Sequence, residues 1–201
     1  MISLPLRLGF LASRNGSSLR AIVGAIEAGT LAAEPRLAVS NNRAAQALEF
    51  ARAHGVPTEV IATQTDPDAA DARLCAALQA AGVELVVLSG YLRRLGPRTL
   101  GAYRNRVLNI HPGPLPRFGG EGMYGRRVHE AVIAAGAAES GVTIHLVDEI
   151  YDNGPLVAAR AVPLAAGETA DSLEARITEL EPAFFVDTLR RVASGELILP
   201  S

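Results

Sequence analysis

The feature that most constrains the fold of this chain is a regular alternation of short apolar runs with longer helical patterns. Strand-like runs lie at 6–12, 36–40, 58–62, 83–90 and 106–110, and helical patterns lie at 18–29, 44–55 and 66–82. The residues at 83–90, "VELVVLSG", form an apolar run, which is typical of a strand covered on both faces. We therefore predict an α/β fold, an open and mostly parallel twisted sheet with helices on both faces.

The rest of the chain continues this pattern without a linker. A helix is predicted at 126–135, strands at 141–147 and 155–164, and a last helix at 169–193 that contains Pro182. The 201 residues contain no internal repeat and no low-complexity tract. We therefore predict a single domain over residues 1–201.

Composition argues against several classes of partner. The chain has 19 basic and 21 acidic residues, a balance that favours neither nucleic acid nor a membrane surface. Apolar runs such as Val83–Leu88 are far shorter than the ~20 residues that span a bilayer, and the N-terminus lacks the layout of a secretory signal. One cysteine, Cys75, suits a reducing compartment. We predict a soluble cytoplasmic protein.

Every basic residue of the chain is an arginine, since the sequence contains no lysine. This absence excludes a lysine Schiff base and the lysine of a phosphate-binding P-loop. Four histidines and one cysteine make a zinc cage hard to assemble, so we predict chemistry without a metal.

A turn of small residues, "ASRNGSS" at 12–18, joins the first predicted strand to the first helix. Backbone amides at the start of a helix form a natural phosphate site. The alternative is a plain helix cap by Ser17 or Ser18.

The stretch "VLNIHPGPLPRFGGEGMYG" at 107–125 ends a buried strand with Asn109 and His111. Side chains alternate along a strand, so these two share one face and could both donate to a developing oxyanion. The prolines that follow make the geometry rigid. The alternative is a structural asparagine beside a partly buried histidine.

A third polar segment, "DEIYDNGPL" at 148–156, places Asp152 just before the turn signal Asn-Gly-Pro. A carboxylate near a histidine raises its pKa and fixes its orientation. The alternative is an Asx-turn made by Asp152 with its own backbone. His145, on the strand before, is either a supporting group or a core histidine, while His54 and His129 receive no role.

Four segments in this order resemble the phosphoribosylglycinamide formyltransferase family: "SRNGSSLRAI", "VVLSGYLRRL", "LNIHPGPLPRFGGEGMYG" and "DNGP". The resemblance covers nearly the whole chain and implies a Rossmann-like formyltransferase fold. It also implies that the formyl group of 10-formyltetrahydrofolate passes to the amine of glycinamide ribonucleotide, through a tetrahedral oxyanion and without a metal.

The resemblance assigns roles to residues of this chain. Asn109 and a protonated His111 would hold the oxyanion, and Asp152 would stabilise the imidazolium. The remaining assignments are Gly16, Ser17 and Ser18 to the ribonucleotide phosphate, Glu181 to the ribonucleotide, and Leu92, Arg93, Arg94, Leu95, Asp148 and Glu149 to the folate.

The chain also departs from the family pattern in its binding segments. Ser18 stands where asparagine is common, Arg94 replaces an apolar residue, and a frequent arginine near Ala72 is missing. These differences affect the expected contacts of the folate tail and leave the catalytic residues in place.

The sequence leaves several alternatives open. A formyltetrahydrofolate deformylase would use water in place of the amine, but such enzymes usually carry a regulatory domain before a first strand that here begins by Leu6. A sugar-nucleotide formyltransferase and a non-catalytic binder also remain. The expected partners are small molecules, and the chain could be a monomer or a homodimer. Whether residues 117–125 move as a lid is undecided.

Overall fold

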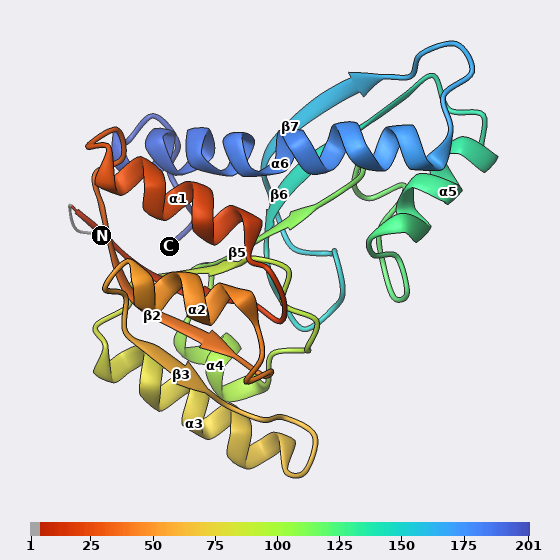
Figure 1. Ribbon diagram of the computed structural model, residues 1–201. Helices are drawn as coiled ribbons and strands as arrows, with labels where there is room; N and C mark the ends of the chain where they lie inside the picture. The colour runs from red at the N-terminus through yellow and green to blue at the C-terminus, as the bar shows by residue number, and fades with distance from the viewer. Residues whose placement is uncertain (1–4) are drawn as a thin grey trace.

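The computed structural model describes residues 5–201 and forms one continuous sheet flanked by helices (Figure 1). Along the chain the elements are β1 (Leu6–Leu11), α1 (Ser17–Glu27), β2 (Ala33–Ser40), α2 (Gln46–Ala53), β3 (Thr58–Val60), α3 (Pro67–Ala80), β4 (Leu85–Leu88), α4 (Pro97–Ala102), β5 (Val107–His111), α5 (Arg126–Ala134), β6 (Glu139–Leu146), β7 (Leu156–Pro163) and α6 (Ala170–Ala193).

The seven strands lie in the order β3-β2-β1-β4-β5-β6-β7. Strands β1 to β5 pair in parallel, whereas β6 and β7 add to the sheet in antiparallel fashion. The prediction of an open, mostly parallel sheet is confirmed.

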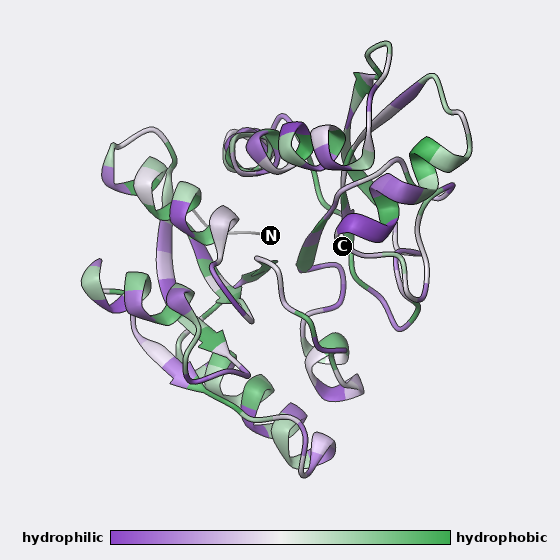
Figure 2. Cartoon of the chain, turned by 45° about the vertical axis from the view of Figure 1, so that its right-hand side comes forward, coloured by the Kyte–Doolittle hydropathy of each residue, from purple (hydrophilic) through white to green (hydrophobic). Residues whose placement is uncertain are grey.

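Two apolar clusters cover the two faces of the sheet. Strand β1 sends Leu6, Leu8 and Phe10 to the cluster shared with α1, α5 and α6, and Leu11 to the cluster shared with α3. This alternation follows from the period of two along a strand. Figure 2 shows the matching pattern on the helices, which carry both hydrophobic and hydrophilic segments because only one side of each is buried.

The central strand β4 is shorter than the predicted run at 83–90. It ends at Leu88 because the next two residues serve neighbouring segments. The Ser89 hydroxyl accepts a hydrogen bond from the Leu19 amide at 3.0 Å, and Gly90, with a φ of 69°, accepts one from the Ser13 amide at 3.1 Å. The predicted last helix is present and runs through Pro182.

The chain reverses its direction across the sheet between β1 and β4, since β2 and β3 lie on one side and β5 on the other. Parallel sheets bind ligands at the carboxyl ends of strands at such a point. The loops after β1 and β4 are joined there, because the Leu92 amide donates to the Ser13 hydroxyl at 2.8 Å. A ligand site is therefore expected beside these loops and the end of β5.

Candidate active site

The end of β5 carries the two polar side chains that the sequence singled out. Asn109 is half-buried, and His111 is only 2% exposed. Strand β5 lies between β4 and β6, so neighbouring backbone on both sides fixes the direction of both side chains. The two groups predicted to act together are held at one place on the sheet.

Both ring nitrogens of His111 face protein groups. Nε2 lies 2.8 Å from the carbonyl oxygen of Phe118, and Nδ1 lies 3.4 Å from Oδ2 of Asp152. A carbonyl oxygen can only accept, so Nε2 carries a proton and donates it to Phe118. Nδ1 is therefore the atom of His111 whose protonation can change during a reaction.

Asp152 reaches His111 from the loop between β6 and β7. Its Oδ2 accepts a hydrogen bond from the Gly120 amide at 3.0 Å, and its Oδ1 lies 3.5 Å from Nε2 of His145. The loop itself is closed by a different carboxylate, because Asp148 accepts from the Ile150 amide at 2.8 Å and from the Asn153 side chain at 3.1 Å. The Asx-turn that the sequence offered as an alternative role for Asp152 is thus made by Asp148.

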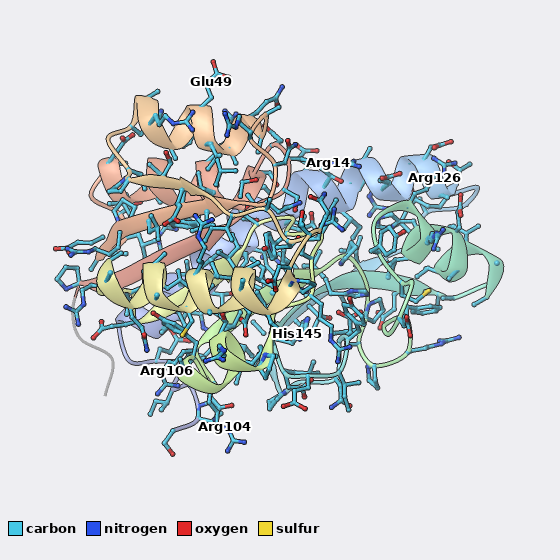
Figure 3. The ribbon with its side chains drawn as sticks, turned by 90° about the horizontal axis from the view of Figure 1, so that it is seen from below. Arg14, Glu49, Arg104, Arg106, Arg126 and His145 are labelled. Carbon is cyan, nitrogen blue, oxygen red and sulfur yellow. The ribbon has the colours of Figure 1, made fainter. Side chains whose placement is uncertain are left out.

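His145 is the site residue for which the sequence left two interpretations. It lies directly opposite Asn109 in the antiparallel pair of β5 and β6, and its Nε2 is 3.0 Å from Nδ2 of Asn109. Its Nδ1 donates to the Leu146 carbonyl oxygen at 2.9 Å, so Nε2 accepts from the Asn109 amide. Figure 3 shows His145 near the centre of the molecule, whereas Arg126 lies on α5 at its outer edge. His145 is a supporting group of the site.

Burial and neighbouring groups shift the pKa values of the His111 imidazole and the Asp152 carboxyl group, and the largest cause prevails only for His111. Burial lowers the pKa of His111 below its usual value, although Asp152 and the Phe118 carbonyl raise it. Burial raises the pKa of Asp152, but contacts with His145, His111 and the Gly120 amide outweigh this and lower it overall. Desolvation of the ring is the largest influence on the pKa of His111 and exceeds the attraction of one carboxylate, so the protonated His111 expected from the resemblance stays a prediction.

The turn before α1 has the shape expected of an anion site. Gly16 begins the helix with a φ of 69°, and a Cβ there would lie 2.8 Å from the Cβ of Ala47, so only glycine fits. No side chain caps this helix, which rules out the plain serine cap. The Leu19 amide is taken by Ser89, so a ligand would be held by the amides that come before it. Ser17 is half-buried and Ser18 is 2% exposed.

Glu181 lies near the middle of α6, the helix that packs against α1 and α5. Burial raises the pKa of its carboxyl to about 7. A carboxyl group with such a pKa changes its charge near neutrality and can adapt to a ligand that donates hydrogen bonds.

A cavity of about 510 Å³ lies between α3 and the segment after β4. Four of the residues predicted to bind folate line it: Arg93, Arg94, Leu95 and Glu149. Leu92 is 52% exposed and lies outside the lining, and Asp148 has both carboxylate oxygens engaged within its own loop. Asp68 and Asp71 line the cavity on the α3 side.

The part of the chain that the structure describes has no group of three or more histidine, cysteine, aspartate and glutamate side chains able to hold a metal ion. Within residues 5–201 no helix is both long and apolar enough to cross a membrane.

The sheet and its switch point are those of the Rossmann-like formyltransferase fold. The family model described as formyl transferase matches residues 6–189. The chain belongs to this formyl transferase family.

Three relatives show how near this similarity is. A chloroplastic phosphoribosylglycinamide formyltransferase of Vigna unguiculata is 35% identical over 194 residues, which are 96% of this chain and 62% of that protein. The Escherichia coli phosphoribosylglycinamide formyltransferase is 33% identical over 93% of this chain and 87% of its own length. The crystal structure of glycinamide ribonucleotide transformylase 1 from Symbiobacterium toebii superposes with a TM-score of 0.86 at 34% identity, covering 98% of this chain and 91% of that one. The chain thus spans less than two thirds of the plant relative.

Proposed function

We propose that this chain is a phosphoribosylglycinamide formyltransferase that moves the formyl group of 10-formyltetrahydrofolate to the amine of glycinamide ribonucleotide, as in purine biosynthesis. The observation that carries the proposal is the meeting of Asn109, His111 and Asp152 at the end of β5, with Nδ1 of His111 3.4 Å from the carboxylate. The names of the relatives agree with this activity.

The proposed reaction starts from a neutral His111 and an ionised Asp152, the forms that the directions of their pKa shifts favour. The amine attacks the formyl carbon, and the former carbonyl oxygen becomes an oxyanion that accepts a hydrogen bond from the Asn109 amide. Neutral His111 takes the proton that the amine nitrogen loses at Nδ1, and Asp152 stabilises the resulting imidazolium. When the intermediate collapses, the bond from carbon to N10 of the folate breaks and N10 receives that proton.

Two physical terms would supply most of the rate enhancement. A single oxyanion donor such as Asn109 typically contributes about 100- to 1000-fold in turnover. Holding the amine and the formyl group in attack geometry lowers the barrier by about 7–11 kcal/mol. The second term depends on both substrates being bound next to His111.

The binding sites follow from the same assignment. The amides of Gly16, Ser17 and Ser18 would hold the ribonucleotide phosphate at the positive end of α1. Glu181 would accept hydrogen bonds from the ribonucleotide, and the cavity beside Arg93, Arg94 and Leu95 would take the folate. The co-substrate supplies the carbon, so no metal is proposed.

We further propose that residues 1–201 act as one domain, since one sheet runs through the described part. A cytoplasmic location is proposed from the single unpaired Cys75, although plant relatives carry the word chloroplastic in their names. A monomer or a homodimer is compatible with a site whose three catalytic side chains come from one chain.

The test is release of tetrahydrofolate from 10-formyltetrahydrofolate, with glycinamide ribonucleotide or water alone as acceptor. We expect rapid release only with the ribonucleotide. His111→Ala should abolish turnover while folate binding persists, because the proton acceptor is lost and the cavity is intact. His54→Ala is the matched control, since His54 contacts Glu27 and none of the proposed catalytic residues.

Other outcomes would point elsewhere. Equal release without the ribonucleotide would identify a deformylase, and release only with an amino-sugar nucleotide would identify the corresponding formyltransferase. Binding of folate without any turnover would contradict the proposal and indicate a non-catalytic binder.

A further inference from the structure

We propose that the segment Phe118–Gly120 is a positioning element that orients His111 and Asp152 together, and that the absent side chain of Gly119 permits this contact. The inference rests on the proposed function. One end of the segment contacts the imidazole through the Phe118 carbonyl, and the other contacts the carboxylate through the Gly120 amide, at 2.8 and 3.0 Å. Three consecutive residues thus connect β5 with the loop after β6.

The segment is held firmly enough to act in this way. The Phe118 side chain is 6% exposed and belongs to the cluster under α5 and α6. The Phe118 amide donates to the Pro114 carbonyl at 3.1 Å, and the Gly119 amide donates to that of Pro116 at 3.3 Å. An aromatic anchor and two turn hydrogen bonds place the Phe118 carbonyl before any substrate binds.

A second anchor ties the start of the same loop to the sheet. The Thr143 hydroxyl on β6 donates to the Gly113 carbonyl at 2.8 Å and lies 3.4 Å from the Leu115 amide. Thr143 pairs with His111 in the β5–β6 register. The strand partner of His111 therefore also supports the loop that contacts its ring.

The contact at Phe118 decides which nitrogen of His111 is reactive. Because the carbonyl accepts the Nε2 proton, Nδ1 is left as the atom that faces Asp152 and the reaction. Without this carbonyl the neutral ring could place its proton on Nδ1, which would then be unable to accept one from the amine.

Gly119 is the point where the segment passes closest to Asp152. A Cβ on Gly119 would lie 2.9 Å from Cβ of Asp152, 3.5 Å from its Oδ2 and 2.3 Å from Cδ2 of Leu115. The φ of Gly119 lies outside the left-handed region, so the backbone itself would accept alanine. An added methyl group would therefore act by pushing the segment and Asp152 apart, rather than by straining the chain.

The two halves of the loop at 117–125 make different contacts. Residues 118–120 contact the catalytic groups, whereas Tyr124 is 57% exposed and stacks only against the Arg127 guanidinium, 5.1 Å from its ring. The positioning role therefore belongs to the first half of the loop.

The experiment compares Gly119→Ala with Gly101→Ala, an exposed glycine of α4 whose added methyl group meets nothing within 4 Å. We expect kcat of Gly119→Ala to fall about 100-fold, the cost typical of a small misplacement of catalytic groups. KM for both substrates should match the values of wild type and of Gly101→Ala, and Gly119→Ala should remain folded at the assay temperature. The acidic limb of the kcat profile should move to lower pH, because the Phe118 carbonyl and the Asp152 carboxylate both hold the pKa of His111, the proposed base, up and their contacts are weakened.

An unchanged kcat, or a fall that matches a loss of folded protein, would overturn the inference. If Gly119→Ala does not fold, nitrogen-15 spectra of the wild-type histidines decide the question instead. A neutral His111 protonated at Nε2 supports the proposal, and protonation at Nδ1 contradicts it. Absence of formyl transfer by the wild-type chain would reject the proposed function, while this tautomer measurement would still test the geometry.

Discussion

At the scale of single residues, burial and local charge decide together which site groups are ionised. Burial lowers the pKa of the His111 ring, which favours its neutral form, while the contacts of Asp152 with His145, His111 and the Gly120 amide lower the pKa of that carboxyl in spite of its burial. This division gives the site a proton acceptor next to a negative charge. A protonated histidine would have offered a donor but no base for the amine.

Glu181 shows the opposite balance, since burial alone moves its pKa to about 7. Between pH 4.5 and about 7 the folded chain keeps a proton that the unfolded chain has lost, so the free energy of unfolding falls as pH rises through this window. The shift corresponds to up to about 3 kcal/mol.

Glu181→Gln cannot ionise and should therefore be more stable than wild type above pH 7. The difference should vanish below pH 4.5, because both side chains are then neutral. Urea unfolding at several pH values measures it. A variant destabilised only above pH 4.5 would show that the carboxyl group is stabilising in its charged form, which would contradict the raised pKa.

At the scale of elements, the loops at the carboxyl ends of the strands contact one another. Arg94, which departs from the family pattern, donates from its guanidinium to the Glu149 carbonyl oxygen and lies 5.8 Å from the centre of the Tyr151 ring. It joins the segment after β4 to the loop that carries Asp152. The exposed arginine thus closes one side of the cavity proposed for folate.

Arg94→Leu removes this connection and leaves the core unchanged. We expect KM for the formyl folate to rise about 3- to 10-fold, since a net hydrogen bond contributes about 0.5–1.5 kcal/mol. Steady-state kinetics measure the change, and Arg94→Lys is the matched variant that keeps the charge without the planar fork. Equal KM values in all three proteins would contradict a role for Arg94 at the cavity.

At the scale of the whole molecule, stability on the acidic side depends on buried histidines. His129 is 1% exposed on α5, and its Nδ1 has no partner among residues 5–201. Burial lowers its pKa, as do His111 and Arg126, while Glu174 on α6 raises it. Below pH 6.5 the unfolded chain binds protons at these two histidines that the folded chain does not bind. The free energy of unfolding therefore decreases as the pH is lowered.

His129→Leu should reduce the loss of stability between pH 6.5 and pH 5, because one of the two buried rings with a lowered pKa is removed. Urea unfolding at pH 7.5 and pH 5 gives the two free energies. The variant should retain formyl transfer, since His129 contacts no catalytic group through a hydrogen bond. An unchanged pH dependence would contradict the prediction and show that His129 has the same pKa in the folded and unfolded states.

The sequence alone predicted the order of elements and singled out Asn109, His111 and Asp152 as candidates, whose catalytic roles stay a prediction. Both depend on local rules: the period of two along β5, the helical period between strands, and the turn residues that follow Asp152. The sequence predicted the ends of the strands less well than their order. Strand β4 stops early because Ser89 and Gly90 serve α1 and the loop after β1, and those partners lie about 70 residues away in the chain.

Only the tertiary structure decided how these residues are connected. The contact of His145 with Asn109 depends on the register of β5 against β6, and the lowered pKa of His111 depends on how completely its neighbours exclude water. The Phe118 carbonyl and the Gly120 amide leave no mark in the sequence, because a backbone group is the same at every position. Local sequence determines which side chains are present at a site, while distances between remote segments determine their protons and partners.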